Sequence, residues 1–333
     1  MGLLKYVASR LGVYLVVLFT GITVIFFLPR MMPADPVEGY IGRLLSESGN
    51  MMTSDDIEQL RTTLRELYGL EGSLQSQYFG FVKRVLFSGD FGPSLYAFPK
   101  PVSEAIATAI PWTLGLLATT TTLAWLLGNM VGLIAGFFHN QRIATVLEVI
   151  GVTLYPIPYY ILALMLIILL AYVWPIFPLS TTIVPGEITW QKVGEIIRNS
   201  FLPGMALVLG GFGWNVLGMK AMAYSTKEEA YVNYARLKGT PSFTIMTQYV
   251  FRNAFLPQIT ALALHMGMIF NGAILTEILF SYPGVGSLIR TAIGNGDYNM
   301  MYGTLSMSII AVATAALAID LLYPLFDPRI RYR

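Results

Sequence analysis

The chain has 333 residues, of which 55% are hydrophobic and only 12% are charged. This share of charged residues is too small to solvate the surface of an ordinary globular domain, so we expect a protein of the lipid bilayer. The formal net charge of +2 gives no indication of a nucleic-acid partner. The absence of cysteine excludes disulfide bonds, thiolate metal sites and cysteine nucleophiles.

The first element, residues 1–30, is an apolar run preceded by Lys5 and Arg10. A secretory signal peptide has similar composition, but no small-residue cleavage site follows this run, and Pro29 and Arg30 stand at its end. We therefore predict a retained signal-anchor transmembrane helix with its N-terminus in the cytoplasm.

A bilayer core about 30 Å thick needs about 20 apolar residues in one helix. Scanning for such stretches predicts an all-α polytopic membrane protein with six transmembrane helices, located in the cell inner (plasma) membrane. Both termini are predicted to be cytoplasmic, because the short outer loops hold few basic residues, namely Lys192, Arg198 and Arg290. The predicted spans are approximately residues 10–30, 112–138, 144–173, 201–222, 257–280 and 302–325.

Residues 31–111 form the one long outer loop, and they are predicted to contain structure of their own. Ser54 begins a segment with acidic residues in its first turn and leucines at helical spacing, and Gly69 follows as a stop. We expect a small extracytoplasmic subdomain, which either contacts a soluble partner or covers the helices without one.

The second predicted span carries Gly128, Gly132 and Gly136 at four-residue spacing. This spacing places small residues on one face and lets another helix approach closely. We interpret the face as helix packing within the chain; a dimer contact between two chains is the alternative.

The cytoplasmic loop 223–256 is the most informative segment. Ser225 with Glu228, and Thr226 with Glu229, fit capping boxes, and they predict a helix that stops at Gly239. Helices in bundles are usually joined by two to eight residues, so a structured loop of this length indicates a docking surface. The alternative is a solvated juxtamembrane helix whose basic residues only set the topology.

The chain has no GxxxxGK[ST] phosphate-binding loop and no HExxH motif, so we expect neither ATP hydrolysis nor a metal site in it. Ionisable residues within predicted spans are few: Glu148, His265, Glu277 and Asp320. A proton-coupled transporter would show a stronger relay at mid-membrane. As candidates that line a translocation path we name His265, Asn271 and Glu277.

The loop resembles the EAA loop of permease subunits of ABC importers, whose pattern is Glu-Ala-Ala, three residues, Gly. Within that superfamily the loop is most similar to the dipeptide, oligopeptide, oligosaccharide and nickel permease group. The matching positions are Tyr231, Asn233, Tyr234, Ala235, Arg236, Lys238 and Gly239, and Asn233 stands where the motif has Glu. Further resemblances are Pro33-Ala34-Asp35-Pro36, Gly89-Asp90-Phe91-Gly92 with Ser94, Pro111-Trp112-Thr113-Leu114, Glu277 with Phe280 to Gly286, and Asp327-Pro328-Arg329.

The resemblance implies a permease subunit of an ATP-driven, binding-protein-dependent importer, with residues 112–326 as a five-helix permease core and 327–333 as a cytoplasmic tail. The loop would be the coupling helix that docks on a cytoplasmic ATPase. Implied partners are a second homologous permease, one or two ABC ATPase subunits and an extracytoplasmic solute-binding protein. This chain would bind no cofactor and catalyse no reaction, since ATP and Mg would be bound by the ATPase. Oligopeptide and oligosaccharide remain open as substrates, with nickel behind them, and a proton- or ion-coupled secondary transporter is the alternative.

Overall fold

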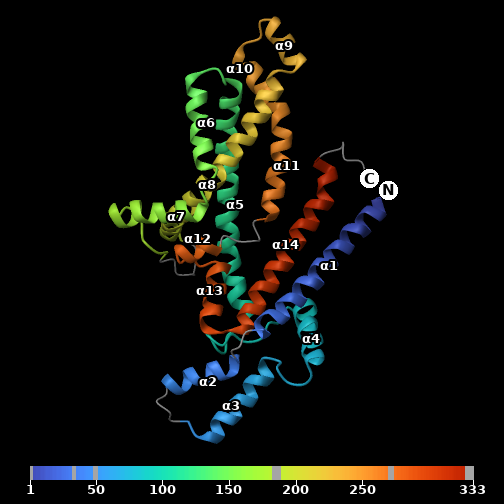
Figure 1. The fold of residues 1–333 in the computed structure, drawn as a ribbon, viewed down its shortest axis with the longest axis vertical. Helices are drawn as coiled ribbons and strands as arrows, with labels where there is room; N and C mark the ends of the chain where they lie inside the picture. Colours follow the sequence, from blue (N-terminus) through green and yellow to red (C-terminus); the bar gives the residue numbers. More distant parts are fainter. Residues whose placement is uncertain (1–2, 32–34, 48–51, 182–188, 269–273, 327–333) are drawn as a thin grey trace. The chain divides into compact units, whose positions relative to one another are not determined.

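The computed structural model describes residues 3–31, 35–47, 52–181, 189–268 and 274–326 (Figure 1). These residues form helices and no β-strand, which confirms the all-α part of the predicted fold class over the described ranges. Four of the described helices are long and apolar enough to cross a membrane, or five if one bent pair counts as a single span. The chain is therefore an all-α polytopic membrane protein.

The chain divides into two compact units, and each has its own hydrophobic core. Unit 1 takes in Met1–Thr113 and Pro283–Leu321, and unit 2 takes in Leu114–Tyr282. The helices of unit 1 are α1 (Leu3–Arg30), α2 (Pro36–Glu47), α3 (Ser54–Leu67), α4 (Leu74–Lys83), the π-helix η1 (Arg84–Ser88), the start of α5 (Val102–Phe137), α13 (Val285–Asn295) and most of α14 (Tyr298–Phe326).

The core of unit 1 joins the end of α1 to the short helices that follow it. Phe26, Val37, Leu64 and Phe81 are buried together with Tyr302 of α14. Burial of apolar area at about 25 cal/mol per Å² is what holds these short helices, since helices of this length are marginal alone.

The α3 helix agrees with the sequence except at its cap. Thr53, rather than Ser54, is the N-cap residue, and it exchanges side-chain hydrogen bonds with Asp56 in a capping box. The predicted stop at Gly69 is confirmed, because Gly69 follows the C-cap with a φ of 60°.

Several short helices occupy segments that a scan for 20-residue apolar stretches leaves as loops. The predicted loop 281–301 contains α13, which buries Ala292 against Val102, Ile106 and Met300. A helix this short is stabilised by its buried face. A search for long apolar stretches therefore does not detect it.

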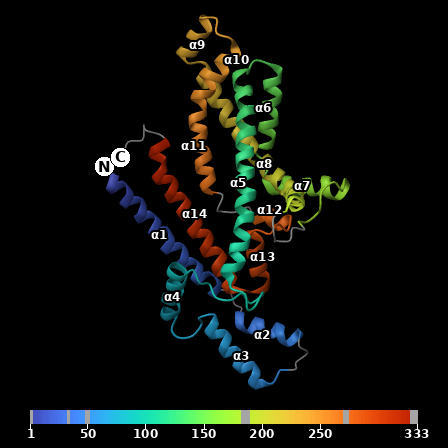
Figure 2. The same cartoon turned by 180° about the vertical axis from the view of Figure 1, so that it is seen from behind.

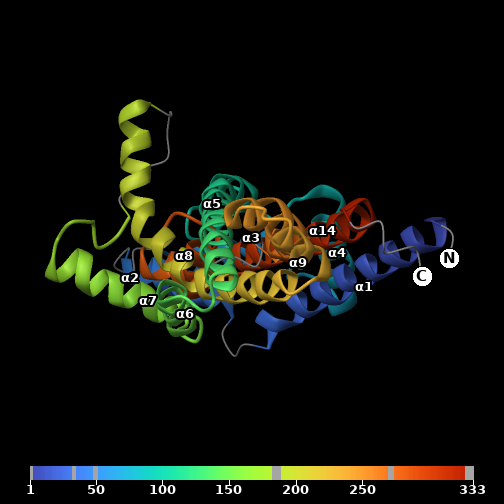
Figure 3. The same ribbon diagram turned by 90° about the horizontal axis from the view of Figure 1, so that it is seen from above.

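Unit 2 contains the remaining helices (Figures 1 and 2). Figure 3 shows that the first turns of α8 project away from the other helices of unit 2. Trp190, in the first of these turns, is 91% exposed. The helices are the rest of α5, α6 (Arg142–Leu154), α7 (Tyr159–Ile167), the π-helix η2 (Ile168–Val173), α8 (Trp190–Lys227), α9 (Ala230–Leu237), α10 (Ser242–Thr244), the π-helix η3 (Ile245–Phe251), α11 (Arg252–Met268) and α12 (Ile274–Leu279).

The predicted span 144–173 contains a break that the apolar pattern does not indicate. The chain bends by 96° between Arg142–Leu154 and Tyr159–Val173. Pro156 and Pro158 stand at the break, and each lacks a backbone N–H and crowds the preceding turn, so the helix cannot continue through them.

The three glycines of α5 lie directly against α8. A Cβ atom at Gly128 would lie 2.5 Å from the Asn215 Cβ, and one at Gly132 would lie 2.5 Å from the Val216 carbonyl oxygen. A Cβ at Gly136 would lie 2.6 Å from the Lys220 carbonyl oxygen. Within unit 2 this face is therefore occupied by α8, whose backbone approaches α5 at van der Waals contact.

Candidate functional site

The loop predicted at residues 223–256 begins later than the capping boxes predict. Ser225 and Thr226 lie in the last turn of α8, and their carbonyls accept hydrogen bonds from the N–H groups of Glu228 and Glu229. Glu229 is the N-cap of α9, and its side chain makes no capping hydrogen bond. Tertiary packing explains the difference: α8 buries Met219 and Ala223 near its end, which favours continuation of the helix over a local cap.

The inner face of α9 is anchored. Val232 is fully buried and Ala235 is 3% exposed. Both pack in one cluster with Met219 of α8 and with Ile245 and Val250 of η3. The helix is therefore held on the ends of α8 and η3 as a fixed part of unit 2, and Figures 1 and 2 show it at one end of that unit.

The end of α9 depends on Gly239, which has a φ of 77°. Its N–H donates to the Arg236 carbonyl at 3.0 Å, and the Thr240 N–H donates to the Ala235 carbonyl at 3.2 Å. These two bonds form a Schellman motif, whose left-handed residue is usually glycine. The chain then turns into α10, whose N-cap is Pro241.

The outer face of α9 is apolar and uncovered. Leu237 is 87% exposed, Tyr234 is 61% exposed and Tyr231 is 42% exposed, and Phe243 of α10 adds a ring that is 71% exposed. Burial, followed by the nearby charge of Glu229, raises the pKa of the Tyr231 phenol, so it remains neutral. We call Tyr231, Tyr234, Leu237 and Phe243 the loop patch; it combines aromatic and aliphatic side chains of the kind that anchor protein interfaces.

The polar residues of the motif organise the loop. Asn233 donates to the Glu228 carbonyl at 3.3 Å and accepts from Arg236 Nη1 at 3.2 Å. The Lys238 ammonium lies 4.7 Å from the centroid of the Tyr234 ring. Asn233 stands at the position where the motif has Glu. Its amide accepts a hydrogen bond from Arg236 and donates one to the backbone before α9.

Two lysines tie the loop to its supporting helices, and sequence reasoning did not assign either role. Lys227 Nζ donates to the Phe137 carbonyl at 2.7 Å and to His139 Nδ1 at 3.3 Å. Lys220 forms an ion pair with Glu148 of α6. The partners of both lysines are far apart in sequence, so the contacts could not be predicted from it. The one available signal was the place of Lys227 in the last turn of a helix, where a cation is favourable.

The predicted path residues are only partly described. His265 is half-buried in α11, and Glu277 of α12 is fully buried. Asn271 lies outside the described residues. Of the other ionisable residues expected within spans, Asp320 is paired with Arg10 at 3.1 Å, as Glu148 is with Lys220. In the described ranges no cluster of three or more histidine, aspartate or glutamate side chains could hold a metal ion.

Residues 128–332 match the family described as "Binding-protein-dependent transport system inner membrane component". The whole chain is similar to a peptide permease protein of Brucella suis, with 28% identity over 99% of both chains. It is also similar to the dipeptide transport system permease protein of Lactococcus lactis, with 25% identity over 99% of this chain and 100% of the relative. The glutathione transport system permease protein of Salmonella choleraesuis is 27% identical over 99% of this chain and 100% of its own length.

Proposed function

Because this chain belongs to the family of binding-protein-dependent transport system inner membrane components, and so is a multi-pass permease subunit of an ABC importer, we propose that it forms half of a translocation path for short peptides. The observation that carries the substrate class is the end-to-end match to relatives named for peptide, dipeptide and glutathione transport. Oligosaccharide and nickel have no such support and are set aside.

The proposed coupling site is the loop patch with Arg236 and Lys238. A docking helix must be rigid on its own protein and apolar toward its partner. Val232 and Ala235 supply the first property, and the exposed Tyr234 and Leu237 supply the second. The patch would insert into a groove of a cytoplasmic ABC ATPase, and the closing of the ATPases on ATP would move α8 and α11 through the buried cluster.

The proposed topology has six spans with both termini in the cytoplasm. The distribution of basic residues supports it. The third span is the bent pair α6 and α7 with η2, and the described helices of the fifth are α11 and α12. In this topology residues 31–111 face the outside, where a solute-binding protein would deliver the peptide.

The assembly we propose contains a second homologous permease, one or two ABC ATPase subunits and a solute-binding protein. This chain performs no bond chemistry: hydrolysis of ATP with Mg takes place in the ATPase. Its own residues provide the path and the docking helix.

Affinity purification of the tagged chain in mild detergent tests the assembly. We expect a second permease and an ABC ATPase to co-elute, and ATP hydrolysis by the reconstituted complex to rise when the binding protein and a dipeptide are added. Stimulation by a disaccharide but not by a dipeptide would contradict the peptide assignment.

Two matched variants test the docking site. Leu237→Asp changes an exposed residue of the loop patch, and Phe87→Asp changes a residue of η1 that is 84% exposed. Loss of a central interface residue costs about 2 kcal/mol or more, or about 30-fold in affinity. Leu237→Asp should therefore lose the ATPase and keep the second permease, while Phe87→Asp keeps both. Retention of the ATPase by Leu237→Asp would place the docking site elsewhere.

A further inference from the structure

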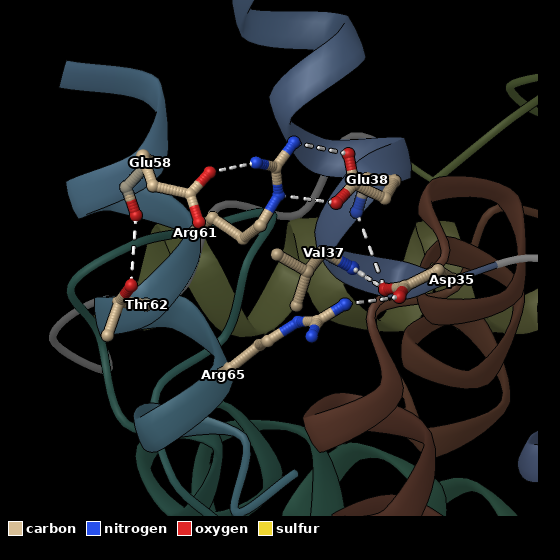
Figure 4. A network of polar contacts seen from close by, with 7 residues as sticks. All are labelled: Asp35, Val37, Glu38, Glu58, Arg61, Thr62 and Arg65. Atoms are coloured by element: carbon tan, nitrogen blue, oxygen red, sulfur yellow. Dashed lines mark hydrogen bonds and ion pairs between the residues drawn. The ribbon is translucent and has the colours of Figure 1, made fainter. Parts of the chain in front are cut away.

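Four arginines of unit 1 differ in how their charges are paired. Arg61 forms ion pairs with Glu38 and Glu58, and Arg65 forms one with Asp35, as Figure 4 shows. Arg30 and Arg84 are half-buried, and neither forms an ion pair with any acidic residue in the described ranges. A cation withdrawn from water without a counter-ion is unfavourable, so these two require a different explanation.

The two unpaired arginines line the same cavity. The cavity volume is about 10 Å³. This is enough for one water or one small ligand group. The complete lining is Arg30, Tyr68, Phe81, Arg84, Asp90, Phe91, Asn299 and Tyr302.

Arg30 is fixed in direction by neutral groups. Its Nη1 donates to the Phe26 carbonyl at 3.0 Å and to the Tyr302 hydroxyl at 2.7 Å, and its Nη2 donates to Gln77 Oε1 at 3.2 Å. The guanidinium carbon lies 3.6 Å from the centroid of the Phe26 ring. A guanidinium has five N–H donors, so after these three bonds two donors remain, and the charge has no anionic partner.

Tyr68 contributes a second observation that points to a ligand. The residue is 4% exposed, and its hydroxyl has no hydrogen-bond partner among the described residues. Burial, followed by the charge of Asp297, raises the pKa of this phenol, so the group stays protonated and remains a donor. Buried hydroxyls are normally satisfied, and the described residues supply no partner for this one.

Asp90 is the one acidic residue of the lining. It is exposed, and its Oδ1 accepts the Gly92 N–H at 2.9 Å. One carboxylate against two guanidiniums leaves the cavity with an excess of positive charge.

We propose that this cavity binds one small monovalent anion, a halide or a carboxylate group, between the guanidiniums of Arg30 and Arg84 and the Tyr68 hydroxyl. All three groups are hydrogen-bond donors, and none of them has an anionic acceptor among the described residues. The small volume favours one such group over a tetrahedral oxyanion such as sulfate. The site is independent of the docking surface in unit 2.

Thermal unfolding of the full chain in detergent tests the site, with sodium chloride or sodium formate compared at equal ionic strength with sodium methanesulfonate. An anion that binds only the folded protein raises the unfolding temperature in a saturable manner. Stabilisation by formate alone identifies a carboxylate site, and stabilisation by chloride as well identifies a general monovalent-anion site. No stabilisation by either salt would overturn the proposal and leave a cavity filled by water.

Three variants separate binding from general salt effects. Tyr68→Phe removes only the hydroxyl, and Arg84→Gln removes one cation; each should weaken the apparent anion affinity, Arg84→Gln by about tenfold or more. Lys83→Gln makes the same charge change at an exposed neighbour and should leave the affinity within about twofold. Equal responses in all three would overturn the proposal.

Asp90→Asn tests an internal counter-ion. With the competing carboxylate removed, the proposed site should bind the anion more tightly than in the unmodified chain. A response to anions that appears only in Asp90→Asn would show that Asp90 fills the site itself, which would also overturn the proposal.

Discussion

Lys227 donates a hydrogen bond from its ammonium to the backbone carbonyl of Phe137 at 2.7 Å, which joins the last turn of α8 to the last turn of α5. The same ammonium lies 5.4 Å from the centroid of the Phe137 ring and donates to His139 Nδ1 at 3.3 Å. A cation at this place satisfies a carbonyl that the helix leaves unpaired at its end, and it complements the helix dipole. The loop that carries α9 therefore starts from a helix end that is fixed to its neighbour.

Replacing Lys227 with Met keeps the apolar stem and removes the ammonium. A hydrogen bond to a charged group is worth about 1.5–3 kcal/mol, so we expect a lower unfolding temperature and weaker coupling of ATP hydrolysis to uptake. Both are measured on the purified complex. Lys238→Met is the matched control for the unfolding temperature alone, because that ammonium is exposed and lies over the Tyr234 ring instead of a backbone carbonyl. An effect of Lys238→Met on unfolding as large as that of Lys227→Met would contradict the role of the carbonyl bond.

Replacing Gly239 with Ile should uncouple ATP hydrolysis from uptake while the protein stays in the membrane. A Cβ at Gly239 would meet no atom within 4 Å, so the cost is conformational and arises from its φ of 77°. A β-branched residue in this region costs about 1–3 kcal/mol. Gly239→Asn is the control, since asparagine tolerates the left-handed region. Full transport by Gly239→Ile would contradict the requirement for this turn.

Arg236→Glu tests the polar part of the same surface. The side chain is exposed and bonds only to Asn233 Oδ1 in the described part of the chain, so the fold should be retained. Reversal of its charge should weaken binding of the ATPase by slowing association and by adding repulsion. Surface plasmon resonance of the isolated ATPase on the immobilised permease measures this, and a smaller effect at high salt is expected. Unchanged binding at low salt would remove Arg236 from the docking site.

The sequence was sufficient for the features that depend on composition and local pattern. The fold class follows from hydropathy, and the stop signals at Gly69 and Gly239 both coincide with residues of positive φ. Glycine punctuates helices for a local steric reason, which explains why these predictions succeed without tertiary information.

The features that depend on tertiary contacts could not be predicted in the same way. Ser225 and Thr226 have the composition of caps, but the buried contacts of Ala223 favour one more turn of α8. Likewise, the exposure of Leu237 depends on which face of α9 packs on α8 and η3. Local propensity is a weak prior, and packing of a buried face overrides it.

Gly132→Ala should destabilise the contact between α5 and α8. The new Cβ would lie 2.5 Å from the Val216 carbonyl oxygen and 2.9 Å from the Met219 Cβ, so the helices must separate. Overpacking of this kind costs about 1–3 kcal/mol. Gly115→Ala in the same helix is the control, because a Cβ there meets nothing within 4 Å. Thermal unfolding in detergent should distinguish the two variants, and equal unfolding temperatures would contradict close packing at Gly132.

Glu38 gives unit 1 an acid-sensitive contact. Hydrogen bonds from Arg61 at 2.6 and 3.1 Å, followed by the charge of Arg61, lower the pKa of Glu38 (Figure 4). A carboxylate whose pKa is lower in the folded state stabilises that state above the unfolded pKa, about 4.3, and the stabilisation is lost as the pH falls through the folded pKa. We expect the unfolding temperature to fall less steeply below about pH 4 in Glu38→Gln than in the unmodified chain.

The control for Glu38 is Glu71→Gln, an exposed acid that forms no ion pair within the described ranges. It should retain the acid response of the unmodified chain. Parallel pH profiles for Glu38→Gln and the unmodified chain would mean that the pair with Arg61 contributes nothing measurable to stability, as many exposed ion pairs do.

Asp297→Asn should destabilise unit 1. The carboxylate is fully buried and accepts from Ser94 Oγ at 2.6 Å, the Tyr96 N–H at 3.1 Å and the Met300 N–H at 3.0 Å. It caps the start of α14 and fixes the loop before α5, and an amide would turn an NH₂ toward one of these donors. Loss of a charge-assisted cap and one buried mismatch together cost about 2–4 kcal/mol. Thermal unfolding measures the loss. Ser94→Ala removes one donor and keeps the cap, so it should cost less; an equal or larger cost for Ser94→Ala would show that the cap contributes little.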